Sequence, residues 1–220
     1  MIFRLQEEPH PAGNSSGSSA WSCWSQGDVQ YSPSSVKAFG TAPTPVSSVS
    51  HCNETATDGK TPYSTVGMQS LLNIIRGTGA TNVVQVPGVQ YANMMACTND
   101  VSPADCGFLQ PGVRVTDTLS SPQLMADVDV YPDYNPCNST SCYNATYAPI
   151  IAQMPFEAGE TGPQNNTILV DRFLTWMDGQ NSGYLAWAWD TWTPLISNYN
   201  GTATSGWGTD YKARLASVVP

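Results

Sequence analysis

The sequence predicts an α/β fold built on a parallel β-sheet with crossover helices, and two observations predict it. Short apolar segments rich in β-branched residues recur along the 220-residue chain. Each of them follows a helical segment or a long connection, which is the pattern of parallel strands joined by crossovers. The chain is long enough to bury one ample core, so we expect residues 1–220 to form a single domain.

The first half of the chain supplies two strands and one helix. The opening strand lies in FRLQEEPHP, at residues 3–11, and residues 12–64 are so rich in Gly, Ser, Thr and Pro that they predict a long loop. The segment VGMQSLLNIIRGTGA predicts a helix that ends at its glycines, and its apolar residues share one face: Met68, Leu71, Leu72 and Ile75. The segment NVVQVPG follows as a buried strand.

The second half repeats this alternation. Strands are predicted at residues 126–131 (ADVDVY), 154–160 (MPFEAGE) and 183–190 (GYLAWAWD). A short helix, YAPIIAQ, and a longer one, TILVDRFLTWMDGQN, separate them, and the longer helix carries Leu169, Phe173 and Trp176 on one face. The Trp176 side chain is therefore expected in the core.

Five strands fit two α/β architectures. A doubly wound sheet usually carries a glycine-rich phosphate motif after its first strand, and EEPHPAGNSSG has neither of the usual spacings. A (β/α)8 barrel requires eight strands and places its active-site residues at the carboxyl ends of the strands. Glu8, Asp129 and Glu160 all fall at or near such ends.

The composition indicates a secreted globular protein. Only 11% of the residues are charged while 40% are hydrophobic, which is typical neither of a disordered tail nor of a membrane protein. The net charge of −9 and the total of 8 Lys and Arg argue against binding of nucleic acid, because phosphates require clustered cations. Neutral substrates remain compatible with this composition.

Six cysteines indicate an oxidising compartment. The pairs Cys137–Cys142 and Cys97–Cys106 each flank a short turn, which leaves Cys23 with Cys52, although sequence alone allows about fifteen connectivities. Zinc is the competing interpretation, but no CxxC occurs and neither histidine stands at ligand spacing, so no metal is expected.

Six Asn-x-Ser/Thr sequons permit glycosylation. No apolar segment follows Met1, so we expect the signal peptide of a secreted protein to lie outside this chain.

Two carboxylates at strand ends indicate a specific chemistry. Two acids that flank a sugar can hydrolyse a glycosidic bond, since one protonates the leaving oxygen while the other attacks the anomeric carbon. Glu8 and Glu160 each follow an apolar strand and precede a turn residue, and several Trp and Tyr residues lie near the other strand ends. Ordinary solvated carboxylates at strand ends are the alternative interpretation of either residue.

The motifs resemble those of a glycoside hydrolase family 5 cellulase, from its fourth strand onward. The matching stretches are QEEPHP, AWSCW, MQSLLNIIRGTGATNVVQVPGVQYAN, NPCNSTSCYNATYAPIIAQMPFEAGETG, GYLAWAWDTW and LISNYNGT. The resemblance implies a partial (β/α)8 (TIM) barrel of about five strands, 4 to 8, and retaining hydrolysis of β-1,4-glucan without a cofactor. It implies that Glu8 is the acid/base, that Glu160 is the nucleophile, and that Trp187 or Trp189 is a sugar platform.

Two positions depart from the family's motifs. Glu7 stands where the family has Asn, and the family's His-x-Tyr is replaced by Asp129-x-Tyr131. Both changes add negative charge beside the two glutamates, and like charges raise the pKa of a carboxyl group. We therefore expect a lowered activity or an acid-shifted optimum.

Other residues are assigned by their place beside these motifs. Tyr91 and Asn93 in GVQYAN follow the second strand and are candidates to line the cleft, as is His10. Trp21 and Trp24 are interpreted either as a cleft wall or as a cover for the core, and the roles of Trp192 and Trp207 stay open.

Three alternatives compete with the hydrolase. A serine hydrolase is disfavoured because the chain has no GxSxG motif and only two histidines. A carbohydrate-binding protein on a degraded barrel would keep the aromatic residues and lose turnover, and an inert truncated product would melt without cooperativity. Because the resemblance covers about five of eight strands, homo-oligomers that pair through exposed sheet edges are also expected.

Overall fold

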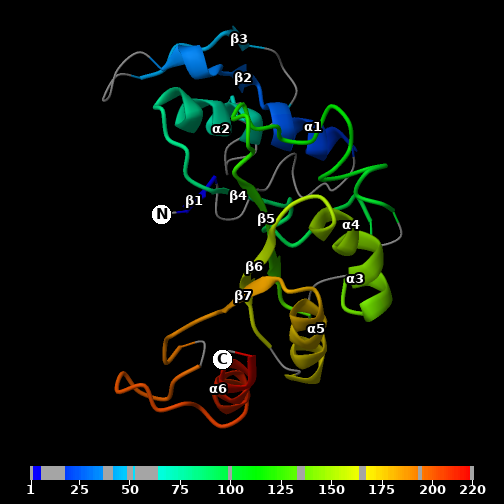
Figure 1. The fold of residues 1–220 in the computed structure, drawn as a ribbon, viewed down its shortest axis with the longest axis vertical. Coiled ribbons are helices and arrows are strands. Elements are labelled where there is room, and N and C mark those ends of the chain that lie inside the picture. The colour runs from blue at the N-terminus through cyan, green and yellow to red at the C-terminus, as the bar shows by residue number, and fades with distance from the viewer. Residues whose placement is uncertain are drawn as a thin grey trace, which may run out of the picture.

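The computed structural model describes residues 2–5, 18–36, 42–48, 52, 64–98, 101–132, 137–163, 167–192 and 195–218. A five-stranded sheet runs through its centre in the order β1-β4-β5-β6-β7, and all neighbouring strands are parallel (Figure 1). The bounds are β1 (Phe3–Arg4), β4 (Val84–Pro87), β5 (Leu124–Val130), β6 (Phe156–Thr161) and β7 (Gly183–Ala186).

The strand order identifies the architecture. The order in the sheet follows the order in the chain without a reversal, whereas a doubly wound sheet reverses at a switch point. Successive parallel strands that add to the same edge form an arc of a (β/α)8 barrel. The predicted fold class is therefore confirmed, and all five predicted strands are present, with β7 ending earlier than GYLAWAWD suggests.

Helices cover one face of the sheet. On the strands, alternate residues such as Val84, Ala126 and Val128 are fully buried and join one hydrophobic core with the inner faces of the helices. The helices are α2 (Met68–Gly77), α3 (Thr140–Thr146), α4 (Ala148–Ile151), α5 (Thr167–Gly179) and α6 (Trp207–Val218). Figure 1 shows α3, α4 and α5 on one side of the strands and α6 beside α5. Helices α2, α4 and α5 were predicted, whereas α3 and α6 were not.

The prediction of a long loop at residues 12–64 is wrong for the part that the structure describes. That part holds α1 (Ser18–Gln26), β2 (Val29–Gln30), the 3-10 helix η1 (Pro33–Ser35) and β3 (Ser47–Ser48). Trp21 and Trp24 are buried, their rings meet edge to face, and the Trp24 indole donates to the carbonyl of Pro87. They cover the core, so they are not a cleft wall, and Trp176 is likewise buried as expected.

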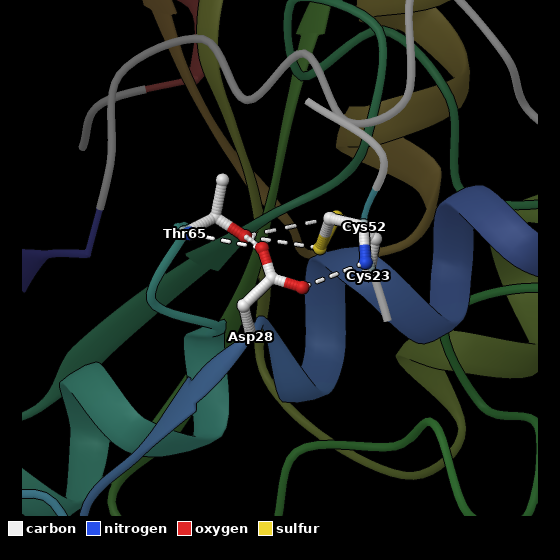
Figure 2. The surroundings of a disulfide bond; sticks show 4 residues. All are labelled: Cys23, Asp28, Cys52 and Thr65. Atoms are coloured by element: carbon white, nitrogen blue, oxygen red, sulfur yellow. Dashed lines mark hydrogen bonds between the residues drawn. A yellow bond between two sulfur atoms is a disulfide. The ribbon is translucent and has the colours of Figure 1, made fainter. Parts of the chain in front are cut away.

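Three disulfides connect the cysteines in the predicted pairs, Cys23–Cys52, Cys97–Cys106 and Cys137–Cys142. The first ties α1 to a distant segment, and Asp28 reinforces it (Figure 2). The buried Asp28 carboxylate accepts hydrogen bonds from the backbone N–H groups of Cys52, at 2.9 Å, and Thr65, at 3.1 Å. Two chain segments are thus anchored on one carboxylate beside a covalent link, which compensates for the few apolar residues in this region.

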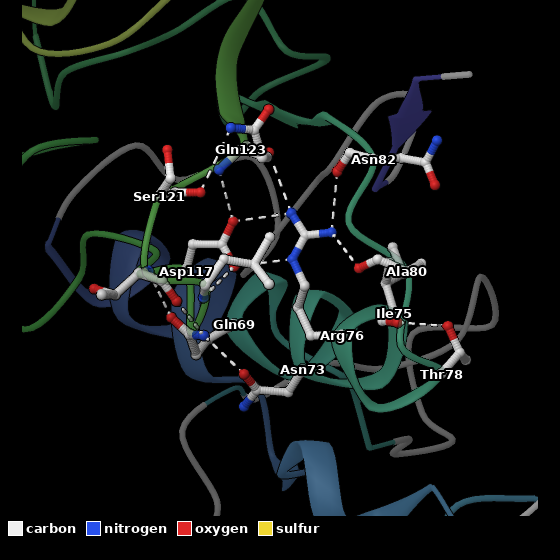
Figure 3. A network of polar contacts seen from close by, with 12 residues as sticks. Gln69, Asn73, Ile75, Arg76, Thr78, Ala80, Asn82, Asp117, Ser121 and Gln123 are labelled. Carbon is white, nitrogen blue, oxygen red and sulfur yellow. Dashed lines mark hydrogen bonds and ion pairs between the residues drawn. The ribbon is translucent and has the colours of Figure 1, made fainter.

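A buried ion pair joins α2 to the segment that precedes β5 (Figure 3). Arg76 donates from Nε and Nη2 to the two carboxylate oxygens of Asp117, each at 2.9 Å, and from Nη1 to the carbonyls of Ala80 and Asn82. Burial raises the pKa of Asp117, but hydrogen bonds from Arg76 and from the backbone of Gln123 outweigh it, so that the net pKa lies below its usual value. The pair fixes how helix α2 meets the sheet.

Replacing Arg76 by Met is expected to lower the free energy of unfolding by about 3–5 kcal/mol, because it leaves the Asp117 carboxylate buried without its cation. Urea unfolding followed by circular dichroism measures this change. The double variant Arg76→Met, Asp117→Leu removes both charges and is expected to recover part of the loss. A loss below about 1 kcal/mol in the single variant would show that the pair is not structural.

No helix among these described residues is long and apolar enough to cross a membrane. The expectation of a single domain over residues 1–220 stays a prediction.

Candidate active site

The face of the sheet opposite the helices is polar. On β5 the buried apolar residues alternate with Asp127 and Asp129, which therefore point to the other face. Gln85 of β4 reaches the same face and donates a hydrogen bond to Glu157 of β6. In a barrel this face is the concave interior, which is usually filled by apolar side chains. Acidic residues in that position require a functional or a charge-pairing explanation.

A bulge in β6 turns Glu160 toward this concave face. Val128 of β5 pairs with Ala158, but the next residue, Asp129, pairs with Glu160, so Gly159 has no counterpart on β5. If Gly159 were instead paired in a regular strand, Glu160 would share the helix-facing side with Ala158, because side chains alternate along a strand. Gly159 is required here, since an added Cβ would collide with the Asp127 carboxylate that accepts a hydrogen bond from the Gly159 N–H.

The carboxylate of Glu160 is held from two sides. Its Oε2 accepts a hydrogen bond of 2.7 Å from the hydroxyl of Tyr131, and its Oε1 lies 3.9 Å from Nη1 of Arg4. The residue is only 8% exposed, so its position is defined by these contacts and not by solvent. Tyr131 and Glu160, two of the predicted site residues, are thus brought together.

Arg4 is a site residue that the sequence analysis missed. Its Nε lies 2.6 Å from Asp127, and its Nη2 donates to both oxygens of Asp129, at 2.8 and 2.7 Å. The sequence does contain a sign of this role, because an arginine inside an otherwise apolar strand must contact a carboxylate or solvent. Its partners lie about 125 positions away along the chain, however, and no local pattern points to them.

The pKa of Asp129 reflects its burial beside other carboxyl groups. Burial raises the pKa of Asp129 to about 8, with a further contribution from the neighbouring Asp127 and Glu160 charges, although the ion pair with Arg4 acts in the opposite direction. Burial and the Asp127 charge also raise the pKa of Glu157. The like-charge coupling expected between Asp129 and Glu160 is present, and Arg4 opposes it.

Stability is expected to fall as pH rises from about 4 to about 8, because the folded state holds the Asp129 proton more tightly than the unfolded chain does. The Asp129 contribution is fully present below the unfolded pKa and is lost as pH rises through the folded pKa. Thermal melts of the parent and of Asp129→Asn across this range measure it. The variant cannot ionise at this position, so its melting temperature should fall less with pH. An identical fall in both proteins would contradict the assignment.

Aromatic side chains gather beyond the carboxyl end of β7. Trp187 and Trp189 follow this strand and are 44% and 70% exposed. Trp192 and Tyr199 are even more exposed, at 84% and 81%, and the turn at Gly201 packs against the Trp189 ring. Trp207, the first residue of α6, is instead buried, which indicates a packing role. Exposed tryptophan rings offer flat apolar surfaces on which the apolar faces of sugar rings can stack.

The loop after β4 approaches the same strand ends. Gln90, Tyr91 and Ala92 all adopt positive φ angles, an uncommon conformation outside glycine. The Ala92 carbonyl accepts a hydrogen bond of 3.1 Å from the backbone N–H of Asp129, and Asn93 donates its amide to the Tyr91 carbonyl. Tyr91 is 49% exposed while Asn93 is half-buried. The loop therefore lies against β5 next to the acidic residues, where strained backbone often marks a functional position.

Glu7, Glu8 and His10 lie outside the described residues, in the segment that follows β1. Their predicted roles stay predictions, as do the substrate contacts proposed for Tyr91, Asn93, Asp129, Tyr131, Trp187 and Trp189. Within the described ranges, no group of three or more His, Cys, Asp or Glu residues is arranged to hold a metal ion.

An α/β arc with a restrained glutamate at a strand end and exposed tryptophans beside it defines the candidate site. Solved structures similar to this fold include a β-glucanase from Saccharophagus degradans, with 17% identity and a TM-score of 0.47 over 68% of this chain and 46% of that chain. An endo-β-1,4-glucanase from Xanthomonas axonopodis pv. citri, carrying three substitutions, matches with 20% identity and a TM-score of 0.49 over 68% of this chain and 52% of that one. The Saccharophagus enzyme has also been solved with cellotetraose.

This chain spans about half the length of these solved chains, from 46% to 52%. No protein-family model and no curated protein sequence matches it.

Proposed function

We propose that this protein is a retaining glycoside hydrolase that cleaves β-1,4-glucan, with Glu160 as the nucleophile and Glu8 as the acid and then the base. The observation that carries the proposal is the Glu160 carboxylate itself. A bulge aims it at the concave face, Tyr131 donates to one oxygen, and Arg4 faces the other. A glycosidase nucleophile needs an ionised carboxylate that is fixed in position, and these two contacts support both requirements.

The surroundings of Glu160 support a neutral polysaccharide as the substrate. Trp187 and Trp189 offer flat apolar surfaces for sugar rings, while Asn93 and Tyr91 offer groups that bond to hydroxyls. The acidic concave face disfavours anionic substrates. Glu7, and Asp129 above its raised pKa, add negative charge near the two glutamates and are proposed to lower the rate.

The disulfides favour an oxidising environment, and we propose that the protein is secreted. In the described part of the sheet, β1 and β7 each have a neighbour on one side only. Association of copies through these edges stays a prediction, and light scattering of the purified chain tests it.

The experiment for the proposed function combines turnover with stereochemistry. The purified chain is incubated with carboxymethyl cellulose, and released reducing sugar is measured. The first anomer formed from cellotetraose is then identified by proton NMR. Release of the β-anomer is expected, because double displacement retains the configuration. Initial release of the α-anomer would overturn the retaining mechanism.

The exposed aromatics specifically favour a second candidate function, a carbohydrate-binding protein without turnover. Calorimetric titration with cellotetraose separates the two: binding without any release of reducing sugar would establish the second candidate. Neither binding nor turnover would contradict both.

A further inference from the structure

The concave face contains a charge arrangement that hydrolysis by two glutamates does not require. The guanidinium of Arg4 contacts three carboxyl groups from two strands, those of Asp127, Asp129 and Glu160. The exposed fractions of the side chains are 17% for Arg4 and 0%, 1% and 10% for the three acids. Among the residues that the structure describes, the Arg4 cation thus lies against three acids in a poorly hydrated space, where its loss has large consequences.

We propose that Arg4 is a positioning residue that keeps the Glu160 carboxylate ionised and directed to the concave face of the sheet. The inference rests on the proposed function, because a positioning role for a nucleophile presupposes the nucleophile. It assigns a role to a residue on β1, the strand at the opposite edge of the sheet from β7.

The geometry supports a positioning role because the guanidinium is itself fixed. Asp127 is anchored by the N–H of Gly159, at 3.0 Å, and lies against Arg4 Nε. Each carboxylate oxygen of Asp129 accepts a hydrogen bond from Nη2. Nε and Nη2 of the planar guanidinium thus face buried carboxylates, and the rigid fork leaves Nη1 on the side of Glu160.

Among the described residues, Arg4 supplies the positive charge of this cluster, and the neighbouring strands supply negative or neutral groups. Strand β1 supplies Arg4, β5 supplies Asp127 and Asp129, and β6 supplies Glu157 and Glu160. Strand β4 contributes the neutral Gln85, and Tyr131 after β5 contributes a hydroxyl. Without Arg4, the like charges would favour protonation of Glu160, and a protonated carboxyl is no nucleophile.

The test compares Arg4→Gln with Arg214→Gln. Arg214 is a matched control, because it is also an ion-paired arginine but lies on α6, where it contacts Asp171 and Asp178. Arg4→Gln is expected to lower kcat at least about tenfold, with KM changed by less than about threefold, and to move the acid limb of the pH–rate profile up by about one unit. Arg214→Gln should do neither. Equal behaviour of the two variants would overturn the proposal.

Two further variants keep the test valid if Arg4→Gln folds poorly, which circular dichroism will show. Arg4→Lys retains the charge without the fork, so the acid limb should stay near its parental position while kcat still falls. At pH values above the raised pKa of Asp129, the double variant Arg4→Gln, Asp129→Asn removes one negative charge with the positive one and is expected to recover part of the lost rate there. A double variant as slow as Arg4→Gln alone would contradict the charge argument.

A readout without turnover separates this inference from the proposed function. With 13C-labelled glutamate, the side-chain carboxyl signal of Glu160 is assigned by its loss in Glu160→Gln and then titrated. Its midpoint should rise by about one pH unit in Arg4→Gln and stay unchanged in Arg214→Gln. An unchanged midpoint in Arg4→Gln would overturn the role of Arg4 even in an active enzyme. Full activity of Glu160→Gln would instead overturn the proposed function, whatever the titration shows.

Discussion

Glu160→Gln is expected to lower the hydrolysis of carboxymethyl cellulose by about a thousandfold or more, because an amide cannot form the glycosyl ester on which double displacement depends. The substitution keeps the size of the side chain and can still accept the hydrogen bond of Tyr131. Its effect should therefore fall on kcat while the fold and the binding of cellotetraose persist.

The matched control for this prediction is Glu157→Gln. Glu157 lies on the same strand and the same face, and it is paired with Gln85 below the strand end. Because we place Glu157 outside the reacting groups, the hydrolysis rate of Glu157→Gln should stay within about threefold of that of the parent. If Glu157→Gln were as slow as Glu160→Gln, the loss would reflect disturbance of the acidic cluster and not removal of a nucleophile.

Gly159→Ala is expected to produce the second large effect, a loss of activity of at least about a hundredfold, since small misplacements of reacting groups have consequences of this size. The new methyl group would collide with the Asp127 carboxylate, which is fixed between Arg4 and the sheet and cannot move aside. The bulge must then shift, and with it the direction of Glu160.

Measurement of kcat together with urea unfolding tests this prediction. The free energy of unfolding should also fall, by about 1–3 kcal/mol, as is usual when a tight site is overfilled. Gly179→Ala is the control, because a Cβ at that position of α5 meets no atom within 4 Å. Normal activity of Gly159→Ala would show that the bulge does not define the site.

The elements that could be predicted from sequence are those with a strong periodic signal. Helix α2 follows from its apolar face, and β4, β5 and β6 from their β-branched runs. Helix α3 was missed because TSCYNAT has few strong helix formers and depends on capping by Ser139. Helix α6 was missed because its apolar stripe is weak, as only Trp207 and Gly208 are buried in it.

The site was predicted less completely than the fold, and the bulge explains part of the difference. Regular alternation from Glu157 would direct Glu160 toward the helices. Only the unpaired Gly159 reverses this direction, and a glycine inside a strand is an ambiguous signal. The predicted strand placed Glu160 at a strand end, as the structure does, but the sequence made no prediction of the face that its side chain occupies.

Arg4 explains the rest of the difference. In the sequence, Asp129 is an added negative charge beside the glutamates, because no cation stands near it in the motifs. The compensating cation is Arg4 of β1. Its side chain reaches Asp129 of β5 across β4, which lies between these two strands in the sheet. Pairings across an intervening strand depend on the assembled sheet and leave no local signature in the sequence.

The most direct test of the central claim is to trap the covalent intermediate. A 2-deoxy-2-fluoro-cellobioside with an activated leaving group slows breakdown of the glycosyl ester more than its formation, so the labelled enzyme accumulates. Intact-mass measurement followed by peptide mapping then locates the sugar. The account predicts one label, on Glu160, and none in Glu160→Gln. A label on another residue, or turnover of the parent without any label, would contradict it.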